Sequence, residues 1–304
     1  MIYIKDMIVN NLKVAYHHFT KKRWNIGFVE FTSLDYLFKN TSLEIKWMEH
    51  HYTDRWFADP FILNINSDEI ELLVEEMNDK MKRGRISKLV VDRKSYVLKK
   101  CKTVLELDSH LSFPALFRFN DVIYIYPENS EAGKLQIYRY NEKKEKAILV
   151  KDLLDLPLTD AIIKIIENVP YLFSTRLPYQ NENILDIYID RECNGRYMLH
   201  QTMSLTDKVA RNAGDFFEWD ESLIRPSQDC NYSYGSGIVF QKVLLKDEVF
   251  SFEEIKRFYP SSWRYHLGLH TFNMQGKIAV VDGKGFCYPL IGYLLEYIKK
   301  KIKR

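Results

Sequence analysis

The 304-residue chain is 46% hydrophobic and 14% aromatic, a composition that allows a large buried core and excludes an intrinsically disordered chain. Its formal net charge of +3 is unevenly placed, because residues 296–304 hold five basic residues and one acid and leave about −1 for the remainder. Nucleic-acid-binding proteins usually spread basic residues over a folded face with aromatic residues among them, so this distribution argues against such a partner.

The N-terminal residues and the cysteines indicate the cellular setting. The first stretch, MIYIKDMIVNNLKVAYHHF, has acidic and amide residues within its apolar run and no small-residue cleavage site, which does not fit a signal peptide. No run approaches the roughly 20 apolar residues that span a bilayer. The four cysteines form no CxxC pair and have no histidine at zinc-site spacing. We therefore expect a cytoplasmic protein without a metal or a cofactor.

Five similar units follow one another from residue 59 onward, each with a polar start, a strand, a turn and a second strand with a polar end. They read ADPFILNINSDEIELLVEE, SFPALFRFNDVIYIYPENS, TDAIIKIIENVPYLFSTR, AGDFFEWDESLIRPSQDC and LHTFNMQGKIAVVDG. We call one residue at the start of each unit its lead residue. Successive lead residues are 54, 47, 53 and 56 positions apart: Asp59, Phe113, Asp160, Ala213 and Leu269. A repeat near 50 residues, built of short strands and tight turns, is typical of β-propeller blades.

Other strand-like segments complete the blades. A blade needs about four strands, and GRISKLVVD, KLQIYRYN and ILDIYID supply outer strands to the first three units. WNIGFVEFTSL and LEIKWMEHH precede the first unit and are expected to close the ring as outer strands of the last blade. The sequence thus predicts an all-β, five-bladed β-propeller over residues 1–289 and a short basic amphipathic helix over residues 290–304. A β-sandwich, or two unrelated β domains, is the alternative.

Propeller geometry brings the polar ends of the units together. In an antiparallel hairpin, the start of the first strand and the end of the second lie at the same edge. If the first strand of each blade lines the central channel, then ADP and VEE, FP and PEN, TDA and STR, AGD and RPSQD, and LHT and VDG all face one mouth. The sequence therefore predicts one polar site at that mouth.

The order of these motifs resembles a known module. Between residues 24 and 283, the motifs W-x-ADPF, VEE, GRIS, HLSFP, PENS, TDA, STR, RPSQDC, YG and GLHT resemble the N-terminal propeller module of plant glucosamine inositolphosphorylceramide transferases and of related bacterial surface-polysaccharide proteins. That module is in turn similar to the five-bladed propellers of arabinanases and β-xylosidases. The resemblance implies a carbohydrate site. The plant proteins carry a separate transferase domain, which we do not expect in a chain of this length.

The resemblance also implies acid and base roles for carboxylates. Its glycosidase relatives use a base Asp on the first blade, which Asp59 in ADPF matches by motif and position. They place the acid on the third blade, which begins at Asp160, and Glu128 at the end of the second unit is the other acid candidate. Their second Asp is expected in HLSFP, where this chain has Ser112 and Phe113, and this departure weighs against plain hydrolysis. The alternative for Asp59 is an Asp before Pro that only caps a turn.

Other residues at the same mouth are candidates for substrate binding. Arg and His can hold a phosphate or an acidic sugar, Gln and Tyr can bond sugar hydroxyls, and Trp can stack on a sugar ring. Of two adjacent glutamates on a strand, Glu75 and Glu76, only one can point to a given face. The candidates are Trp56, Glu76, Arg176, Arg225, Gln228, Asp229, Tyr234 and His270. Ion pairing of the charged residues with one another, or packing of the tryptophan in the core, is the alternative.

The C-terminal residues 290–304 read LIGYLLEYIKKKIKR. A helix here has one apolar stripe, with lysines largely opposite: Ile291, Leu294, Leu295, Ile298 and Ile302. One interpretation is a helix that lies on an anionic membrane surface. The alternative is that the stripe packs against the propeller and the lysines are merely solvated.

These observations favour a glycosyl-transferring enzyme of bacterial surface polysaccharide or glycolipid assembly, with Asp59 as general base. Its expected partners are a sugar, a sugar nucleotide or a lipid-linked saccharide, and an anionic membrane surface to which the cytoplasmic protein binds peripherally. One alternative is a hydrolase or phosphorylase of small intracellular glycosides, which Asp59 with Glu128 or Asp160 supports. Another is a non-catalytic sugar-binding propeller, which the missing second Asp supports. The sequence lacks a Gly-rich phosphate loop and a D-x-D motif, which argues against a metal-dependent nucleotide-sugar transferase.

Overall fold

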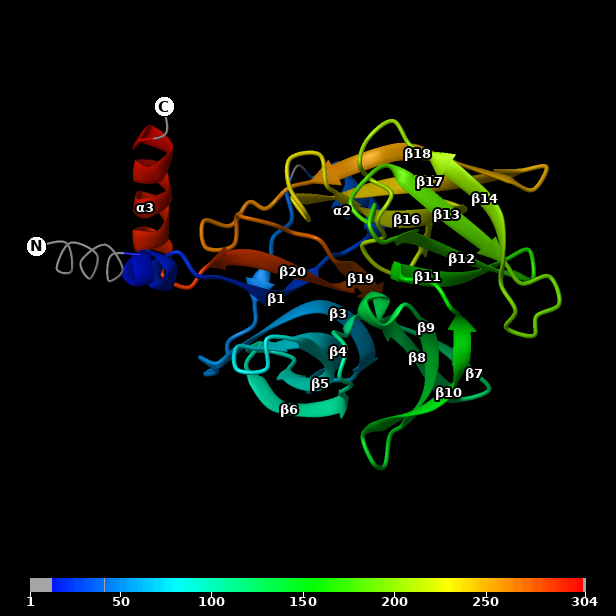
Figure 1. The fold of residues 1–304 in the computed structure, drawn as a ribbon, viewed down its shortest axis with the longest axis horizontal. Helices are drawn as coiled ribbons and strands as arrows, with labels where there is room; N and C mark the ends of the chain where they lie inside the picture. The colour runs from blue at the N-terminus through cyan, green and yellow to red at the C-terminus, as the bar shows by residue number, and fades with distance from the viewer. Residues whose placement is uncertain (1–12, 41, 303–304) are drawn as a thin grey trace, which may run out of the picture.

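Five four-stranded antiparallel sheets surround a central axis in the computed structural model, which describes residues 13–40 and 42–302 (Figure 1). Each sheet begins with an inner strand and adds its neighbours outward in an up-and-down order. The five-bladed β-propeller predicted from the repeat is therefore confirmed, as is the C-terminal helix.

Four blades are each continuous in the chain. The first contains β3 (Arg55–Ile65), β4 (Glu69–Asn78), β5 (Gly84–Asp92) and β6 (Leu98–Leu105). The second contains β7 (Ser112–Phe119), β8 (Val122–Glu128), the 3-10 helix η1 (Ser130–Ala132), β9 (Leu135–Asn141) and β10 (Lys146–Leu154). The third contains β11 (Leu158–Ile166), β12 (Val169–Arg176), β13 (Ile184–Ile189) and β14 (Met198–Ser204). The fourth contains β15 (Phe217–Trp219), β16 (Ser222–Asp229), β17 (Gly237–Lys246) and β18 (Val249–Phe258).

The fifth blade joins both ends of the chain. Its strands, from the channel outward, are β19 (Phe272–Gln275), β20 (Ile278–Phe286), β1 (Lys22–Glu30) and β2 (Lys46–Trp47). Strand β1 pairs with β20 over its whole length, and the short helix α2 (Leu34–Lys39) lies between β1 and β2 in the chain. The N-terminal strands therefore complete the fifth blade as its two outer strands, and this pairing closes the ring.

Turn chemistry explains why the strands end where they do. Several hairpins have two-residue loops in which both residues take positive φ, as at Asn120 and Asp121 (48° and 60°) and at Asp220 and Glu221 (48° and 56°). This geometry matches the right-handed twist of the flanking strands, and Asn and Asp adopt it more readily than most residues. Aromatic side chains then fill the spaces between blades. Phe61 and Phe113, from the first and second blades, pack edge to face with ring centroids 4.9 Å apart.

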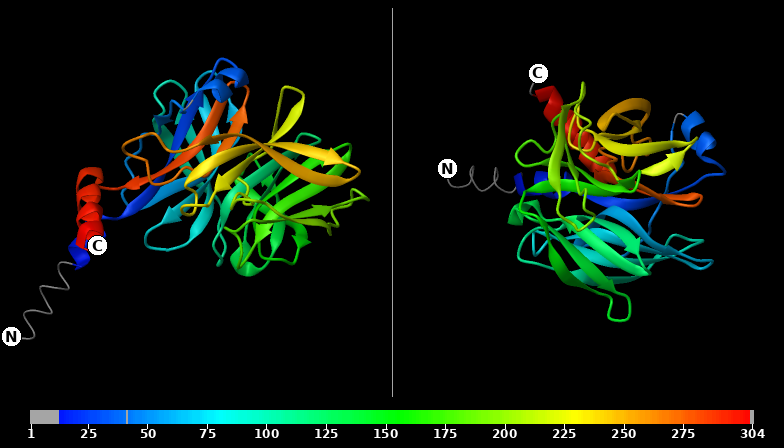
Figure 2. Two further views of the ribbon diagram at one scale, coloured as in Figure 1. Left: turned by 90° about the horizontal axis from the view of Figure 1, so that it is seen from above. Right: turned by 90° about the vertical axis from the view of Figure 1, so that its right-hand side faces the viewer.

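Helix α3 (Pro289–Ile302) projects away from the propeller beside the helical residues 13–19 (Figures 1 and 2). The Tyr16 hydroxyl donates to Glu296 at 2.9 Å, and the Tyr293 hydroxyl donates to the carbonyl of Trp263 at 2.7 Å. One apolar stripe faces solvent instead of the propeller, with exposed fractions between 42% and 80%: Leu290, Ile291, Leu294, Tyr297, Ile298 and Ile302. Among the described helices, none has the length and apolar content that a bilayer crossing needs.

Candidate functional site

Three lead residues share an uncommon backbone conformation. Asp59, Phe113 and Asp160 have φ values of 51°, 43° and 46°, in the left-handed region that residues other than glycine seldom occupy. Each lies in a β-bulge of the first hairpin of its blade. A bulge bends the strand and re-aims a side chain, and bulges are common beside functional sites. The three positions are therefore structurally equivalent, as their spacing in the sequence predicted.

The Asp59 carboxylate is buried between three blades. Its Oδ1 accepts a hydrogen bond from the Thr271 hydroxyl at 2.9 Å, and its Oδ2 accepts one from the backbone N–H of Phe113 at 3.1 Å. Its own backbone N–H donates to Asp282 at 3.0 Å. Only 4% of Asp59 is exposed. A carboxylate has about four acceptor sites, so these two bonds leave it able to accept a proton or a further hydrogen bond.

His270 links this carboxylate to the fifth blade. Its Nδ1 lies 2.7 Å from Asp282 Oδ2 and 3.8 Å from Asp59 Oδ1, and its ring stacks on Trp24 with centroids 3.9 Å apart. Burial lowers the pKa of His270, but the charges of Asp282 and Asp59 more than compensate and raise it above its ordinary value. Burial raises the pKa of Asp282, but His270 and backbone N–H donors hold it below its usual range. His270 and Asp282 thus form a buried ion pair beside Asp59.

Asp160 belongs to a second charged group, on the other side of the mouth. Arg211 Nε donates to Asp160 Oδ2 at 2.6 Å, and Gln228 Nε2 donates to the same oxygen at 2.6 Å. Glu128 accepts from Arg211 at 3.2 Å and from the backbone N–H of Asp160 at 3.0 Å. All four side chains are buried and come from the second, third and fourth blades or their connections. One guanidinium therefore balances two carboxylates.

The two lead aspartates both titrate near neutrality. Burial raises the pKa of Asp59 to about 7, against the opposing charge of His270. Burial likewise raises the pKa of Asp160 to about 7, with Arg211 opposing and Glu128 adding to the rise. The charge of Asp160 also contributes to the raised pKa of Asp59. Carboxyl groups with a pKa near the working pH suit general acid–base chemistry.

Tyr234 lies over both groups. Its ring stacks against the Arg211 guanidinium at 5.0 Å and meets the His270 ring edge to face at 5.2 Å. Burial and the nearby carboxylates raise the pKa of Tyr234, so its hydroxyl stays a neutral donor and acceptor. The residue is 36% exposed, more than the charged groups beneath it. Tyr234 is thus the more accessible side chain beside both charged groups.

The adjacent glutamates of β4 divide between two faces. Glu75 lies 3.3 Å from His110 Nε2, and its charge raises the pKa of Asp59, so it is on the channel side. Glu76 accepts instead from Arg55 at 2.7 Å and from Arg85 at 2.8 Å, away from the channel group. The sequence-based choice of Glu76 as the binding residue therefore falls on the wrong member of the pair, because side chains alternate along a strand.

Arg225 does not reach the channel group. Its guanidinium is 0% exposed and donates to Gln241 at 2.6 Å, to Asn212 at 2.9 Å and to the carbonyl oxygens of Val209 and Ala210. These bonds tie the connection before the fourth blade to that blade. Arg225 is thus placed as a structural residue, and the sequence-based expectation of a direct substrate contact does not match its position.

Two other candidates are also engaged elsewhere. Asp229 accepts from Arg257 at 3.0 Å and from Tyr259 at 2.8 Å, both on or beside β18. Arg176 lies 3.1 Å from Asp186 on the neighbouring strand of its own blade, with 47% of its side chain exposed. Both residues form the ion pairs that the sequence left open as the alternative to ligand binding.

Several members of the site were missed in the sequence. Arg211 and Asn212 precede the lead residue Ala213 in RNAG, and Thr271 and Asp282 lie in the LHT and VDG ends of the fifth unit. The last two stood inside motifs already placed at the mouth. Arg211 lies outside the repeated pattern, in a connection between blades. The alternation of side chains along a strand does not predict where a side chain in such a connection points. The arginine and asparagine directly before a lead residue were the feature of the sequence that could have indicated these two residues.

Among the described residues, Asp59, His270 and Asp282 each offer a ligand atom, and these atoms lie within 4.8 Å of one another. Two carboxylates and an imidazole are a donor set that a divalent cation accepts. Nδ1 of His270 is engaged with Asp282, so a cation there would have to displace that contact.

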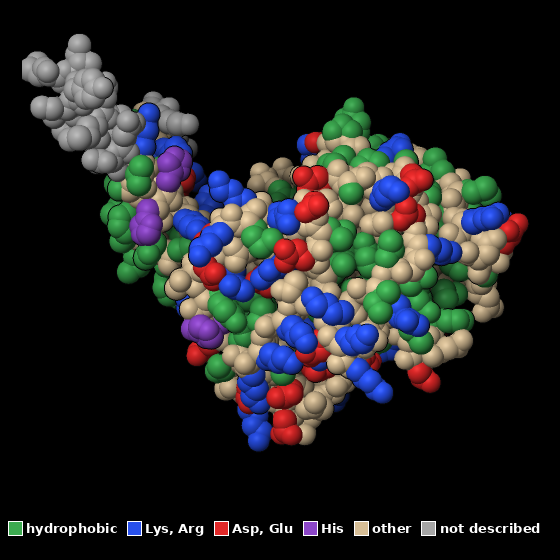
Figure 3. All heavy atoms as spheres, turned by 60° about the horizontal axis from the view of Figure 1, so that its bottom comes forward, with side chains coloured by type: hydrophobic (Ala, Val, Ile, Leu, Met, Phe, Trp, Pro, Cys, Tyr) green, Lys and Arg blue, Asp and Glu red, His purple; other side chains and the backbone are tan. Residues whose placement is uncertain are grey.

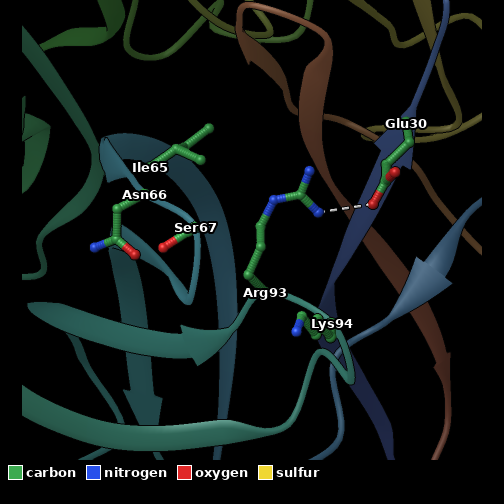
Figure 4. A pocket seen from close by; sticks show the side chains of 6 residues that line it. All are labelled: Glu30, Ile65, Asn66, Ser67, Arg93 and Lys94. Atoms are coloured by element: carbon green, nitrogen blue, oxygen red, sulfur yellow. Dashed lines mark hydrogen bonds and ion pairs between the residues drawn. The ribbon is translucent and has the colours of Figure 1, made fainter.

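A shallow hollow of about 540 Å³ lies at the opposite end of the blades (Figure 4). Its lining comes from the end of β1, the β3–β4 turn and the β5–β6 turn, and Arg93 pairs with Glu30 at 2.8 Å within it. Strand β3 runs from Asp59 at the mouth to Ile65 at this hollow, about 20 Å at 3.3 Å per residue. The hollow is therefore remote from the lead aspartates.

Comparison with known protein families adds to this geometry. Residues 24–284 match the family model described as glucosamine inositolphosphorylceramide transferase 1, N-terminal. The chain belongs to this family. It is 30% identical over 251 residues to glucosamine inositolphosphorylceramide transferase 1 of Arabidopsis thaliana and 28% identical over 254 residues to that of Oryza sativa subsp. japonica. The matches cover 75% and 77% of this chain, but only 32% and 34% of the relatives, so the chain spans about a third of their length.

Solved structures show the same architecture. A family 117 glycoside hydrolase from the marine bacterium Zobellia galactanivorans superposes with a TM-score of 0.54 over 86% of this chain and 91% of its own, at 8% sequence identity. The exo-β-1,3-galactanase of Phanerochaete chrysosporium superposes with a TM-score of 0.55 over 72% and 57% of the two chains, at 9% identity. Identities this low establish a shared fold and nothing further.

Proposed function

We propose that this chain binds a saccharide at the channel mouth and catalyses glycosyl transfer, with Asp59 as general base. The observation that carries the proposal is the pair of buried aspartates, Asp59 and Asp160, on equivalent lead positions of the first and third blades, each with a pKa near 7. Membership of a family named after a glycosyltransferase supports a carbohydrate ligand.

The proposed reaction is a single displacement. The Asp59 carboxylate takes the proton of an acceptor hydroxyl while that oxygen forms a bond to the anomeric carbon of the donor sugar. The bond between the anomeric carbon and the leaving group breaks, and the leaving group takes the electron pair. Asp160, when protonated, supplies a proton to the departing oxygen, and Tyr234 and Gln228 bind sugar hydroxyls. Arg211 holds Asp160 and Glu128 in place.

Phe113 favours transfer over hydrolysis. It occupies the lead position of the second blade with a fully buried ring packed on Phe61, so this position lacks the second Asp that the resemblance to glycosidases would lead one to expect. Hydrolysis of small glycosides remains the second enzymatic candidate, since Asp59 could deprotonate water by the same geometry. A binding-only propeller is the third, and it is favoured by the protein donors that already contact Asp59 and Asp160.

The proposed setting is the assembly of a surface polysaccharide or glycolipid at the cytoplasmic side of a bacterial membrane, where a lipid-linked saccharide serves as acceptor. The exposed apolar stripe of α3 supports membrane association, together with the lysines of its last turn, Lys299, Lys300 and Lys301. An amphipathic basic helix inserts its apolar face among acyl chains, and each nearby lysine contributes on the order of 1 kcal/mol on an anionic surface.

The variant Leu294→Glu is expected to weaken binding to vesicles containing anionic lipid by about tenfold, since it places a charge on the inserting face. Sedimentation with vesicles of phosphatidylcholine and phosphatidylserine measures this. Leu199→Glu is the matched control, because Leu199 is 54% exposed on β14 and Leu294 is 58% exposed on α3. Equal loss in both variants, or loss in neither, would reject the role of α3.

Product analysis distinguishes the three functional candidates. The protein is incubated with a panel of nucleotide sugars and sugar phosphates, each with and without glycolipid acceptors, and products are identified by mass spectrometry. We expect glycosylated acceptor and acceptor-dependent release of the leaving group. Free sugar formed equally without acceptor would establish hydrolysis instead, and ligand binding without any product would support the binding-only candidate.

A further inference from the structure

A cavity of about 830 Å³ lies at the channel-mouth end of the fifth and first blades. Its lining combines the start of β1, the end of β20, the start of β3, Trp47 of β2 with the segment that follows it, and residues 264–265. Three of the five tryptophans of the chain line it, Trp24, Trp47 and Trp56, together with Tyr52 and Tyr265. Planar aromatic surfaces at this density suit the apolar face of a sugar ring, and Trp56 was a binding candidate on sequence grounds.

The charged side chains of the lining are mostly basic. Four are cationic, Lys21, Arg23, Arg55 and Arg264, and one is acidic, Glu49. Three of the cations have acidic partners outside the lining, at Asp79 for Lys21 and Arg23 and at Asp54 and Glu76 for Arg55. Arg264 is exposed and, within residues 13–40 and 42–302, has no ion pair; its guanidinium lies 5.6 Å from the Tyr265 ring. Arg264 is therefore the cationic side chain of the lining that is open to an anionic ligand.

Buried polar atoms in the same wall lack partners within the described part of the chain. They are Arg23 Nε, Asn25 Oδ1 and His50 Nδ1. Asn25 is only 4% exposed, and its amide nitrogen already donates to Met48 and to Tyr265. Buried polar groups are nearly always hydrogen-bonded, so unsatisfied ones beside a cavity point to a polar ligand or to water. Burial, together with the nearby Arg23 and Arg264 charges, lowers the pKa of His50 to about 4, in keeping with a positive potential at the wall.

The cavity lies between the base of α3 and a wall that includes Trp24. At one end, His18 and Tyr288 stand at the base of α3, with ring centroids 5.0 Å apart. At the other end, Trp24 stacks on His270, which contacts Asp282 and, through it, Asp59. On the face shown in Figure 3, lysine and arginine side chains lie along the junction between the projecting segments and the propeller body. The wall of the cavity is therefore in contact with the charged group around Asp59 through Trp24 and His270.

We propose that this cavity binds the phosphate group of a phosphorylated saccharide, with Arg264 and Arg23 as cationic contacts and with Trp56 against the sugar. The inference deepens the proposed function, on which its catalytic meaning rests, but phosphate binding itself does not depend on catalysis. Guanidinium groups match phosphate oxygens in a bidentate fork, and the aromatic walls limit competition from water. The cavity lies beside the base of α3, where His18 and Tyr288 line it.

Tryptophan fluorescence provides the test, because most tryptophans of the chain line the cavity. The purified protein is titrated with the 1-phosphates of glucose, galactose, mannose and N-acetylglucosamine, with the parent sugars, with glucuronate and with inorganic phosphate. We expect at least one sugar phosphate to bind tenfold more tightly than its parent sugar, and inorganic phosphate to compete with it. If no sugar phosphate exceeds its parent sugar, or if glucuronate binds best, the proposal is overturned.

Substitution of Arg264 locates the binding. Arg264→Ala is expected to weaken the best sugar phosphate five- to tenfold, the loss of one charge-assisted contact, and to leave the parent sugar unchanged. The matched control is Arg196→Ala, an exposed arginine in the β13–β14 connection, which should change neither. The fold is checked by circular dichroism. Unchanged affinity in Arg264→Ala would contradict the site.

Two further experiments test phosphate binding separately from catalysis and identify the source of the phosphate. The Asp59→Asn variant should bind the sugar phosphate with the same affinity as the unsubstituted protein. If this variant loses turnover but keeps that affinity, the cavity is a phosphate site independent of the catalytic role of Asp59. Vesicles carrying a lipid-linked sugar phosphate are compared with the soluble sugar phosphate. If Arg264→Ala weakens the binding of both the vesicles and the soluble sugar phosphate, one site binds the phosphate from either source. If Arg264→Ala weakens the binding of neither ligand, the proposed site is rejected.

Discussion

Asp59→Asn is expected to lower the rate of glycosyl transfer by about 10³-fold while the propeller remains folded. General bases typically contribute 10²- to 10⁴-fold, and an amide cannot take the acceptor proton. Asparagine tolerates left-handed backbone well, so φ of 51° is retained, and its carbonyl can still accept from the backbone N–H of Phe113. The measurement is kcat with a saturating donor and acceptor, with circular dichroism as the check on folding.

A matched substitution controls for the backbone. Asp121 also has positive φ, 60°, but lies in an exposed turn of the second blade, at the end away from the mouth. Asp121→Asn should leave kcat unchanged. If Asp59→Asn retains more than about a tenth of the activity, Asp59 is not the base.

The pH profile follows from the same carboxyl pair. Asp59 must be ionised to accept a proton and Asp160 protonated to donate one, and both pKa values lie at about 7. The rate of the unsubstituted protein is therefore expected to pass through a maximum near pH 7, falling below as Asp59 is protonated and above as Asp160 loses its proton. A rate that is level between pH 5 and pH 9 would contradict these assignments.

Arg211→Met is expected to have the largest effect on stability. Arg211 is the cation that contacts both Asp160 and Glu128, and it is 8% exposed. Removing one member of a buried ion-pair network leaves charge without compensation, which commonly costs about 3–5 kcal/mol. Urea denaturation followed by tryptophan fluorescence measures the free energy of unfolding.

The loss of stability in the Arg211→Met variant should increase as the pH rises. Without Arg211 the pKa of Asp160 in the folded state rises further above its unfolded value. A group with a raised folded-state pKa stabilises the protein below its unfolded pKa and loses that contribution as pH rises through the folded value. The variant is therefore most destabilised above pH 7 and least near pH 5. Adding Asp160→Asn should recover much of the loss at pH 8, and an Arg211→Met variant as stable as the parent at that pH would show that Arg211 neutralises nothing.

The repeat predicted the architecture because the spacing of blades is a property of the whole chain. Errors of one or two residues at strand ends do not change a period near 50, and each unit has its own turn residues, such as Asn120 and Asp121. The lead positions Asp59, Phe113 and Asp160 were found by that period, and their shared bulge and φ show that they are structurally equivalent.

The contacts of individual side chains were harder to predict. Alternation left Glu75 and Glu76 open, and only the observed register decides between them. Arg225 stood in a motif that ends at the mouth, yet its guanidinium is engaged by carbonyl oxygens of the preceding connection. Arg211 reaches Asp160 from 51 residues away, in a segment without periodicity. Contacts set by connections between blades are determined by tertiary packing, which a single sequence does not show.

The most direct test of the central claim is a crystal structure of the Asp59→Asn variant, slowed in turnover, with the saccharide that the binding titrations select. We expect the sugar at the channel mouth beneath Tyr234, with a hydroxyl within hydrogen-bond distance of residue 59 and an anomeric carbon between residues 59 and 160. A saccharide bound with the side chains of residues 59 and 160 both out of reach would contradict it.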